Sequence, residues 1–138
     1  MSPSRDHHDT PALHIELEPN PGAPAEARAA IAAFSKNHGL DTDALATLML
    51  LVSELVTNAV IHPAVEPPAE ISLLARLAGT VIRVEITDRG NGFTPQERDH
   101  TRVDGGYGLY LLDKAATRWG VERRDGTTVW FEMLAQAV

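Results

Sequence analysis

LLVSELVTNAVIH, residues 50–62, is the stretch that decides the fold. Together with the residues that follow Asp41, it has apolar side chains around most of a helical circumference, which predicts a central helix buried by the rest of the domain. Asp41 is suited to cap the start of this helix, and His62-Pro63 ends it. Glu54 and Asn58 interrupt the apolar pattern four residues apart, so they lie on one face of the helix.

Outside this helix, the chain divides into short periodic segments separated by glycine and proline. Their order is strand, helix, central helix, two strands, lid, helix, two strands, which predicts an α/β domain over residues 12–138 after a flexible tail at 1–11. Residues 90–105 are a polar, glycine-containing loop typical of a lid. The other expected elements are strands at 12–18, 70–77, 81–87, 121–124 and 128–134, and helices at 24–38 and 108–119.

Composition excludes several classes of protein. The chain has 138 residues, 43% hydrophobic and 22% charged, which is typical of one soluble globular domain. Its net charge of −7 argues against direct nucleic-acid binding, which needs clustered lysine and arginine. There is no cysteine, so disulfides and thiolate metal sites are absent. The polar start is not a signal peptide, and no apolar run is expected to span a membrane, so we expect a cytoplasmic location.

The Glu54–Asn58 pair has two interpretations. It can be a pair of polar residues on the exposed stripe of the helix, which the helix alone slightly favours. Alternatively, Asn58 supplies an oxygen to Mg²⁺, which takes few protein ligands and relies on substrate phosphates for the rest. Glu54 then accepts a proton from an attacking hydroxyl.

Asp88-Arg89-Gly90-Asn91-Gly92 follows the strand at 81–87. These residue types are those of a plain turn. In the functional interpretation, the carboxylate of Asp88 accepts a hydrogen bond from an adenine amino group, while Gly90 and Gly92 let the backbone approach the base.

Gly105-Gly106-Tyr107-Gly108-Leu109 leads into the helix at 108–119. Glycines before a helix N-terminus offer free N–H groups to phosphates, although a flexible loop without a ligand has the same composition. The spacing matches neither a P-loop nor a Rossmann fingerprint.

Two further segments fit the nucleotide interpretation. In Gly126-Thr127-Thr128, either threonine can present a hydroxyl to the adenine side of a pocket, although a hairpin turn there needs no function. Arg102 in the lid could contact the β- or γ-phosphate, whereas a solvated loop arginine is the default.

Taken together, these motifs resemble the GHKL ATP-binding fold of gyrase B, histidine kinases and MutL. Within that fold they are most similar to bacterial anti-sigma factor serine kinases, in particular the short stand-alone ATP-binding regulators of actinomycetes. The resemblance spans nearly the whole chain after residue 12. Its matching segments are residues 50–62, 88–93, 106–112 and 126–131.

The resemblance implies a two-layer α/β sandwich, with helices on one face of a mixed, mainly antiparallel sheet. It also implies ATP and Mg²⁺, with Glu54 as the general base, Asn58 as the metal ligand and Arg28 as a partner contact. The nucleotide-binding residues that it implies are Asn58, Asp88, Gly90, Gly92, Gly106, Gly108, Leu109, Thr128 and Arg102.

The function implied is an anti-sigma factor that phosphorylates a serine or threonine of an anti-anti-sigma (STAS-type) partner and sequesters a sigma factor. Homodimers occur among such proteins, and no membrane or nucleic-acid contact is implied. The alternative is a nucleotide-gated binding regulator that holds a partner without phosphotransfer. A histidine-kinase catalytic domain is disfavoured, because no helical dimerisation segment with a phosphoacceptor histidine precedes the motifs.

Overall fold

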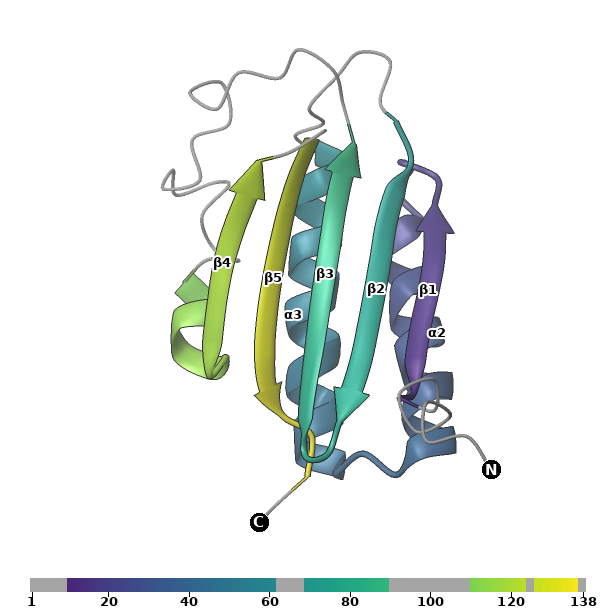
Figure 1. Ribbon diagram of the computed structural model, residues 1–138. Helices are drawn as coiled ribbons and strands as arrows, with labels where there is room; N and C mark the ends of the chain where they lie inside the picture. Colours follow the sequence, from purple (N-terminus) through teal and green to yellow (C-terminus); the bar gives the residue numbers. More distant parts are fainter. Residues whose placement is uncertain (1–9, 62–68, 90–109, 124–125, 137–138) are drawn as a thin grey trace, which may run out of the picture.

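In the computed structural model, the described residues are 10–61, 69–89, 110–123 and 126–136. They form a five-stranded sheet with two long helices on one of its faces (Figure 1). The two-layer α/β sandwich predicted from the motifs is therefore confirmed.

The sheet has the strand order β1-β2-β3-β5-β4. All four neighbouring pairs are antiparallel, so the parallel pairing that a mixed sheet requires does not occur among the described strands. The strands are β1 (Ala12–Leu17), β2 (Ile71–Ala78), β3 (Val81–Arg89), β4 (Arg118–Arg123) and β5 (Gly126–Leu134).

The two long helices are α2 (Ala23–His38) and α3 (Thr42–Ile61). Residues 39–41 connect them, and they both end α2 and begin α3. Gly39 has φ of 69° and its N–H donates to the Ser35 carbonyl oxygen at 2.8 Å, which ends α2 in a left-handed cap. Asp41 Oδ2 accepts hydrogen bonds from the N–H groups of Asp43 at 3.1 Å and Ala44 at 3.3 Å. The predicted N-cap of the central helix is thus confirmed.

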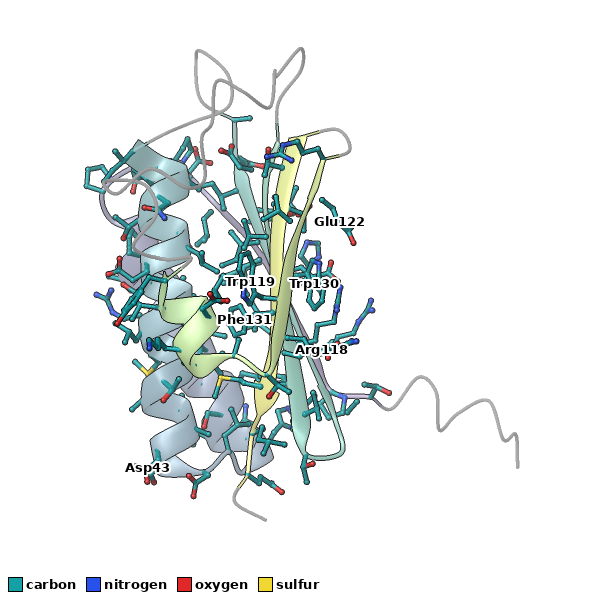
Figure 2. All side chains as sticks on the ribbon, turned by 90° about the vertical axis from the view of Figure 1, so that its left-hand side faces the viewer. Asp43, Arg118, Trp119, Glu122, Trp130 and Phe131 are labelled. Atoms are coloured by element: carbon teal, nitrogen blue, oxygen red, sulfur yellow. The ribbon has the colours of Figure 1, made fainter. Side chains whose placement is uncertain are left out.

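The core lies between the helix layer and the sheet, as the side view in Figure 2 shows. Alternate residues of each central strand point into it, and burying each large apolar side chain stabilises the fold by roughly 1.5–3 kcal/mol. The fully buried large side chains include Leu17, Ile31, Leu48, Leu51, Val52, Ile71, Leu73, Ile82, Val84, Leu112 and Phe131.

Helix α3 is long and apolar enough to cross a membrane by length and composition, so the expectation that no run could do so is corrected. The helix nevertheless packs on the sheet, and Leu48, Leu51 and Val52 are fully buried between the layers. The core helix of a soluble protein can be as long and apolar as a membrane span, so the length and composition of α3 do not show that it crosses a membrane.

Element ends differ from the prediction near the last helix and the last strands. Helical residues are described at 110–115, and β4 already begins at Arg118, where the prediction continued the helix to Trp119. The Thr117 N–H donates to the Glu132 carbonyl oxygen at 2.7 Å, which starts the ladder with β5. Strand β3 continues to Arg89 and β5 begins at Gly126, so both strands are longer than predicted.

Candidate functional site

Two buried polar side chains lie next to each other on the helix-facing side of the sheet. Asp88 is near the end of β3 and Thr127 near the start of β5, and the two residues pair directly across the antiparallel ladder. Only 4% of Asp88 and 2% of Thr127 is exposed. Directly opposed residues have Cβ atoms about 5 Å apart, so the carboxylate and the hydroxyl share one small region of the interior.

The hydroxyl of Thr127 has no hydrogen-bond partner within the described part of the chain, although its Oγ1 is buried. Leaving a buried hydroxyl unpaired costs about 1–3 kcal/mol, so native proteins rarely retain one without a reason. A polar ligand that enters beside Asp88 would supply the missing partner. The pair therefore fits a nucleotide base, which offers both hydrogen-bond donors and acceptors.

Glu54 and Asn58 are both half-buried on α3. The neighbouring residues Leu55, Val56 and Ala59 are buried and hold this part of the helix on the sheet. In Figure 1, the C-terminal end of α3 and the end of β3 lie at the same end of the molecule. The fold therefore brings Asn58 to the end of the sandwich that carries Asp88, with Glu54 one turn earlier.

Arg28 is half-buried on α2 and turns toward α3. Its Nη1 donates to Ser53 Oγ at 2.7 Å. This hydrogen bond joins the two helices at Ser53, the residue that precedes Glu54 in the sequence. The role of Arg28 as a partner contact stays a prediction.

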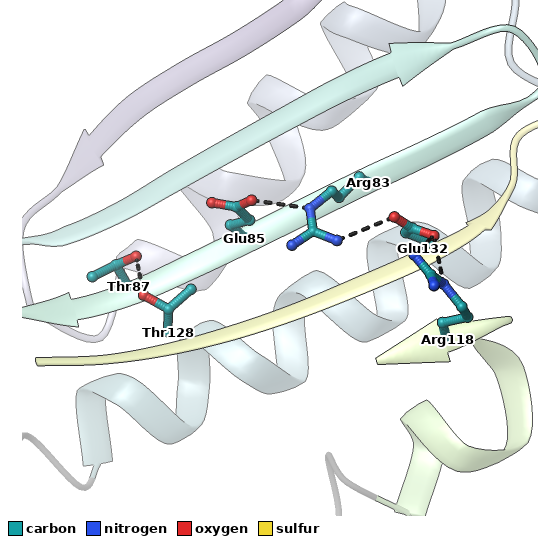
Figure 3. A network of polar contacts seen from close by, with 6 residues as sticks. All are labelled: Arg83, Glu85, Thr87, Arg118, Thr128 and Glu132. Carbon is teal, nitrogen blue, oxygen red and sulfur yellow. Dashed lines mark hydrogen bonds and ion pairs between the residues drawn. The ribbon is translucent and has the colours of Figure 1, made fainter. Parts of the chain in front are cut away.

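Thr128 lies on the opposite face of the sheet from Asp88, which corrects its assignment to the adenine side. Its Oγ1 is 2.8 Å from Thr87 Oγ1, as Figure 3 shows, and it pairs with Thr87 across the ladder. Successive side chains of a strand point to opposite faces, so of the two threonines only Thr127 shares the face of Asp88.

The open face also carries a network of charged groups. Arg83 donates to Glu85 at 3.0 Å and to Glu132 at 3.1 Å, and Arg118 donates to Glu132 at 3.0 Å (Figure 3). The hydrogen bond from Arg118, followed by that from Arg83, holds the pKa of Glu132 below its usual value. The Arg83 guanidinium also stacks on Trp130, 4.2 Å from the ring centroid. These contacts tie β3, β4 and β5 together on the open face, five residue pairs along the ladder from the buried pair.

Several predicted site residues lie outside the described residues, and their assignments stay predictions. They are Gly90, Gly92, Arg102, Gly106, Gly108 and Leu109. Among the described residues, no group of three or more His, Cys, Asp or Glu side chains is placed so that it could hold a metal ion. A Mg²⁺ site would therefore combine Asn58 with the phosphates of a nucleotide, as hard cations that keep few protein ligands do.

Comparison with known proteins places this geometry in a family. Residues 17–133 match the histidine kinase-like ATPase domain. The fold is similar to the crystal structure of the RsbU and RsbW domains of Rv1364c from Mycobacterium tuberculosis, with 25% identity, a TM-score of 0.70 and 94% of this chain covered. The chain spans about a third of that structure's length, since 35% of it is covered.

A comparison with curated proteins finds no match. The family match nevertheless covers most of the chain, from Leu17 at the end of β1 to Met133 in β5. It includes Asp88, Thr127 and the polar pair on α3, and it agrees with the GHKL resemblance inferred from the motifs. The chain belongs to the histidine kinase-like ATPase domain family.

Proposed function

We propose that the protein is an anti-sigma factor with ATP-dependent serine/threonine kinase activity. It would phosphorylate an anti-anti-sigma partner of the STAS type, sequester a sigma factor and work in the cytoplasm. Membership of an ATPase domain family implies ATP binding. The observation that carries the proposal is the buried Asp88–Thr127 pair, whose orphaned hydroxyl lies at the same end of the sandwich as Asn58.

Each polar side chain has a distinct role in this proposal. Asp88 accepts a hydrogen bond from the adenine amino group, and the Thr127 hydroxyl pairs with the same base. The side-chain oxygen of Asn58 would hold Mg²⁺, which when bound neutralises charge on the phosphates.

Glu54 would act as the general base for phosphoryl transfer. Its carboxylate takes the proton from a serine hydroxyl of the partner while that oxygen bonds to the γ-phosphorus. The bond from the γ-phosphorus to the β–γ bridging oxygen breaks, and ADP leaves. Glu54 is only half-buried, so its carboxylate can be reached by a hydroxyl from another protein.

Two measurements test the proposal. Calorimetry with Mg-ATP compares the wild type with Asn58→Ala, and Asn37→Ala on the exposed side of α2 serves as a matched control. Asn58→Ala should weaken binding strongly while Asn37→Ala leaves it unchanged. Unchanged affinity in Asn58→Ala would refute the metal-ligand role.

The second measurement is label transfer from γ-labelled Mg-ATP in a host lysate, with Glu54→Gln against the exposed control Glu18→Gln. A small protein labelled by the wild type and by Glu18→Gln, but not by Glu54→Gln, is the expected result. ATP binding without any label transfer would instead indicate the nucleotide-gated binding regulator.

A further inference from the structure

Two exposed apolar side chains bracket Glu54 on the outer side of α3. Leu50 is 48% exposed and Ile61 is 60% exposed. Leu50 precedes Glu54 by one turn, and Ile61 follows Leu50 by eleven residues, or about three full turns. All three side chains therefore lie along one stripe of the helix, directed away from the sheet.

The core of the protein does not need either side chain. The buried side of α3 is complete without them and consists of Leu48, Leu51, Val52, Leu55, Val56 and Ala59. A single exposed leucine is ordinary, because most protein surfaces contain apolar atoms. Two large apolar side chains in line with a proposed catalytic carboxylate are a more specific arrangement.

The position of Glu54 determines what must cover this stripe. If Glu54 takes a proton from a protein hydroxyl, that hydroxyl must come within hydrogen-bonding reach of the carboxylate. The acceptor chain must then lie across α3 at this point. Leu50 lies about 6 Å from Glu54 along the helix axis, and Ile61 about 10 Å in the opposite direction. An acceptor surface that extends about 16 Å along α3 at this point would contact both.

We propose that Leu50 and Ile61 form a docking surface for the phosphoacceptor protein. This inference rests on the kinase function proposed above and adds the chemistry of the substrate surface. The acceptor would present its serine between two apolar patches, about 6 Å away on one side and about 10 Å away on the other. Contact with Leu50 and Ile61 removes these side chains from water, so they determine acceptor affinity.

The test uses purified STAS-domain proteins of the host as acceptors and γ-labelled Mg-ATP. Leu50→Gln keeps the length and helix propensity of the side chain but removes its apolar character. Leu134→Gln is a matched control, because Leu134 is also 48% exposed but lies at the end of β5, on the open face of the sheet. Ile61→Gln is the second variant.

We expect Leu50→Gln to raise the KM for the acceptor about five- to tenfold. The complex would lose the burial of about half a leucine side chain and would instead bury a polar amide. The kcat and the affinity for Mg-ATP should be retained. Ile61→Gln should act in the same direction, and Leu134→Gln should match the wild type.

Unchanged acceptor KM in Leu50→Gln and Ile61→Gln, with label transfer intact, would overturn this inference and leave the kinase function standing. An equal rise in Leu134→Gln would also overturn it. Absence of wild-type transfer to every STAS protein, with ATP binding intact, would reject the kinase function and the docking surface together. A wild-type dimer that Leu50→Gln dissociates in sedimentation would assign the stripe to a second copy and overturn the inference.

Discussion

Replacing Thr127 by valine should change the stability of the free protein and its affinity for ATP in opposite senses. The Thr127 hydroxyl is buried without a partner in the described part of the chain. Valine has the same shape, favours strands and needs no hydrogen bond. The substitution therefore removes a cost from the free protein and a hydrogen bond from the nucleotide complex.

The magnitudes follow from the burial of this single hydroxyl. Burying this hydroxyl unpaired costs about 1–3 kcal/mol, and valine retains the methyl group that threonine already buries. We therefore expect the free energy of unfolding to rise by about 1 kcal/mol. For a chain of this length, that corresponds to a rise of roughly 3 °C in Tm. Loss of one neutral hydrogen bond to the base should raise the Kd for ATP about two- to tenfold.

Urea denaturation without nucleotide measures the first effect, and calorimetry with Mg-ATP measures the second. Thr128→Val is the control, because it removes a 2.8 Å hydrogen bond to Thr87 on the other face of the sheet. It should lower stability by about 0.5 kcal/mol and leave ATP affinity unchanged. Lower stability and unchanged affinity in Thr127→Val would refute the reasoning, since the hydroxyl would then be satisfied in the free protein and remote from the base.

Three further substitutions probe the surrounding strands. Gly120→Ala should destabilise the fold by about 1–3 kcal/mol in urea denaturation, because its Cβ would lie 2.7 Å from Trp130 Nε1. The pKa of Glu132 is lowered in the folded protein, so the contribution of its carboxylate to folding stability is fully present above the ordinary pKa of 4.5 and is lost as the pH falls. The wild type should therefore be more stable than Glu132→Gln at neutral pH, and this difference in the free energy of unfolding should vanish in acid. Asp88→Asn should weaken the preference for ATP over GTP, and competition calorimetry would contradict the adenine assignment if the wild type bound both equally.

Local sequence patterns were sufficient to predict the helix layer. Helix α2 begins and ends within a residue of its predicted bounds, because helical periodicity and the Gly39 cap are both local signals. Asp41 likewise marks the start of α3 through two backbone hydrogen bonds. The pattern also singles out Glu54 and Asn58 as candidates, since polar residues in an apolar helix are visible without any tertiary information; their roles stay predictions.

Long-range pairing decided the elements that the sequence did not predict correctly. The helix expected to reach Trp119 gives way to β4, because residues 118–123 complete the ladder with β5. Gly120 lies opposite Trp130 and leaves room for the indole ring, a contact between residues far enough apart that no local pattern reveals it. The Trp119 indole N–H also donates to Asp113 at 2.8 Å, which joins the described helical residues to β4.

The choice between Thr127 and Thr128 shows how much a site assignment depends on register. The two residues are chemically identical and adjacent, so motif order alone permits either to face the base. Pairing of Asp88 with Thr127 determines which threonine shares the face of Asp88, because opposed residues in a ladder share a face and their neighbours do not. A one-residue shift of β5 against β3 would move the orphaned hydroxyl to the open face and bring the Thr128 side chain into the interior. The resemblance to a family can therefore predict which motif to examine for base recognition, whereas the register of the sheet determines which of its hydroxyls shares the face of Asp88.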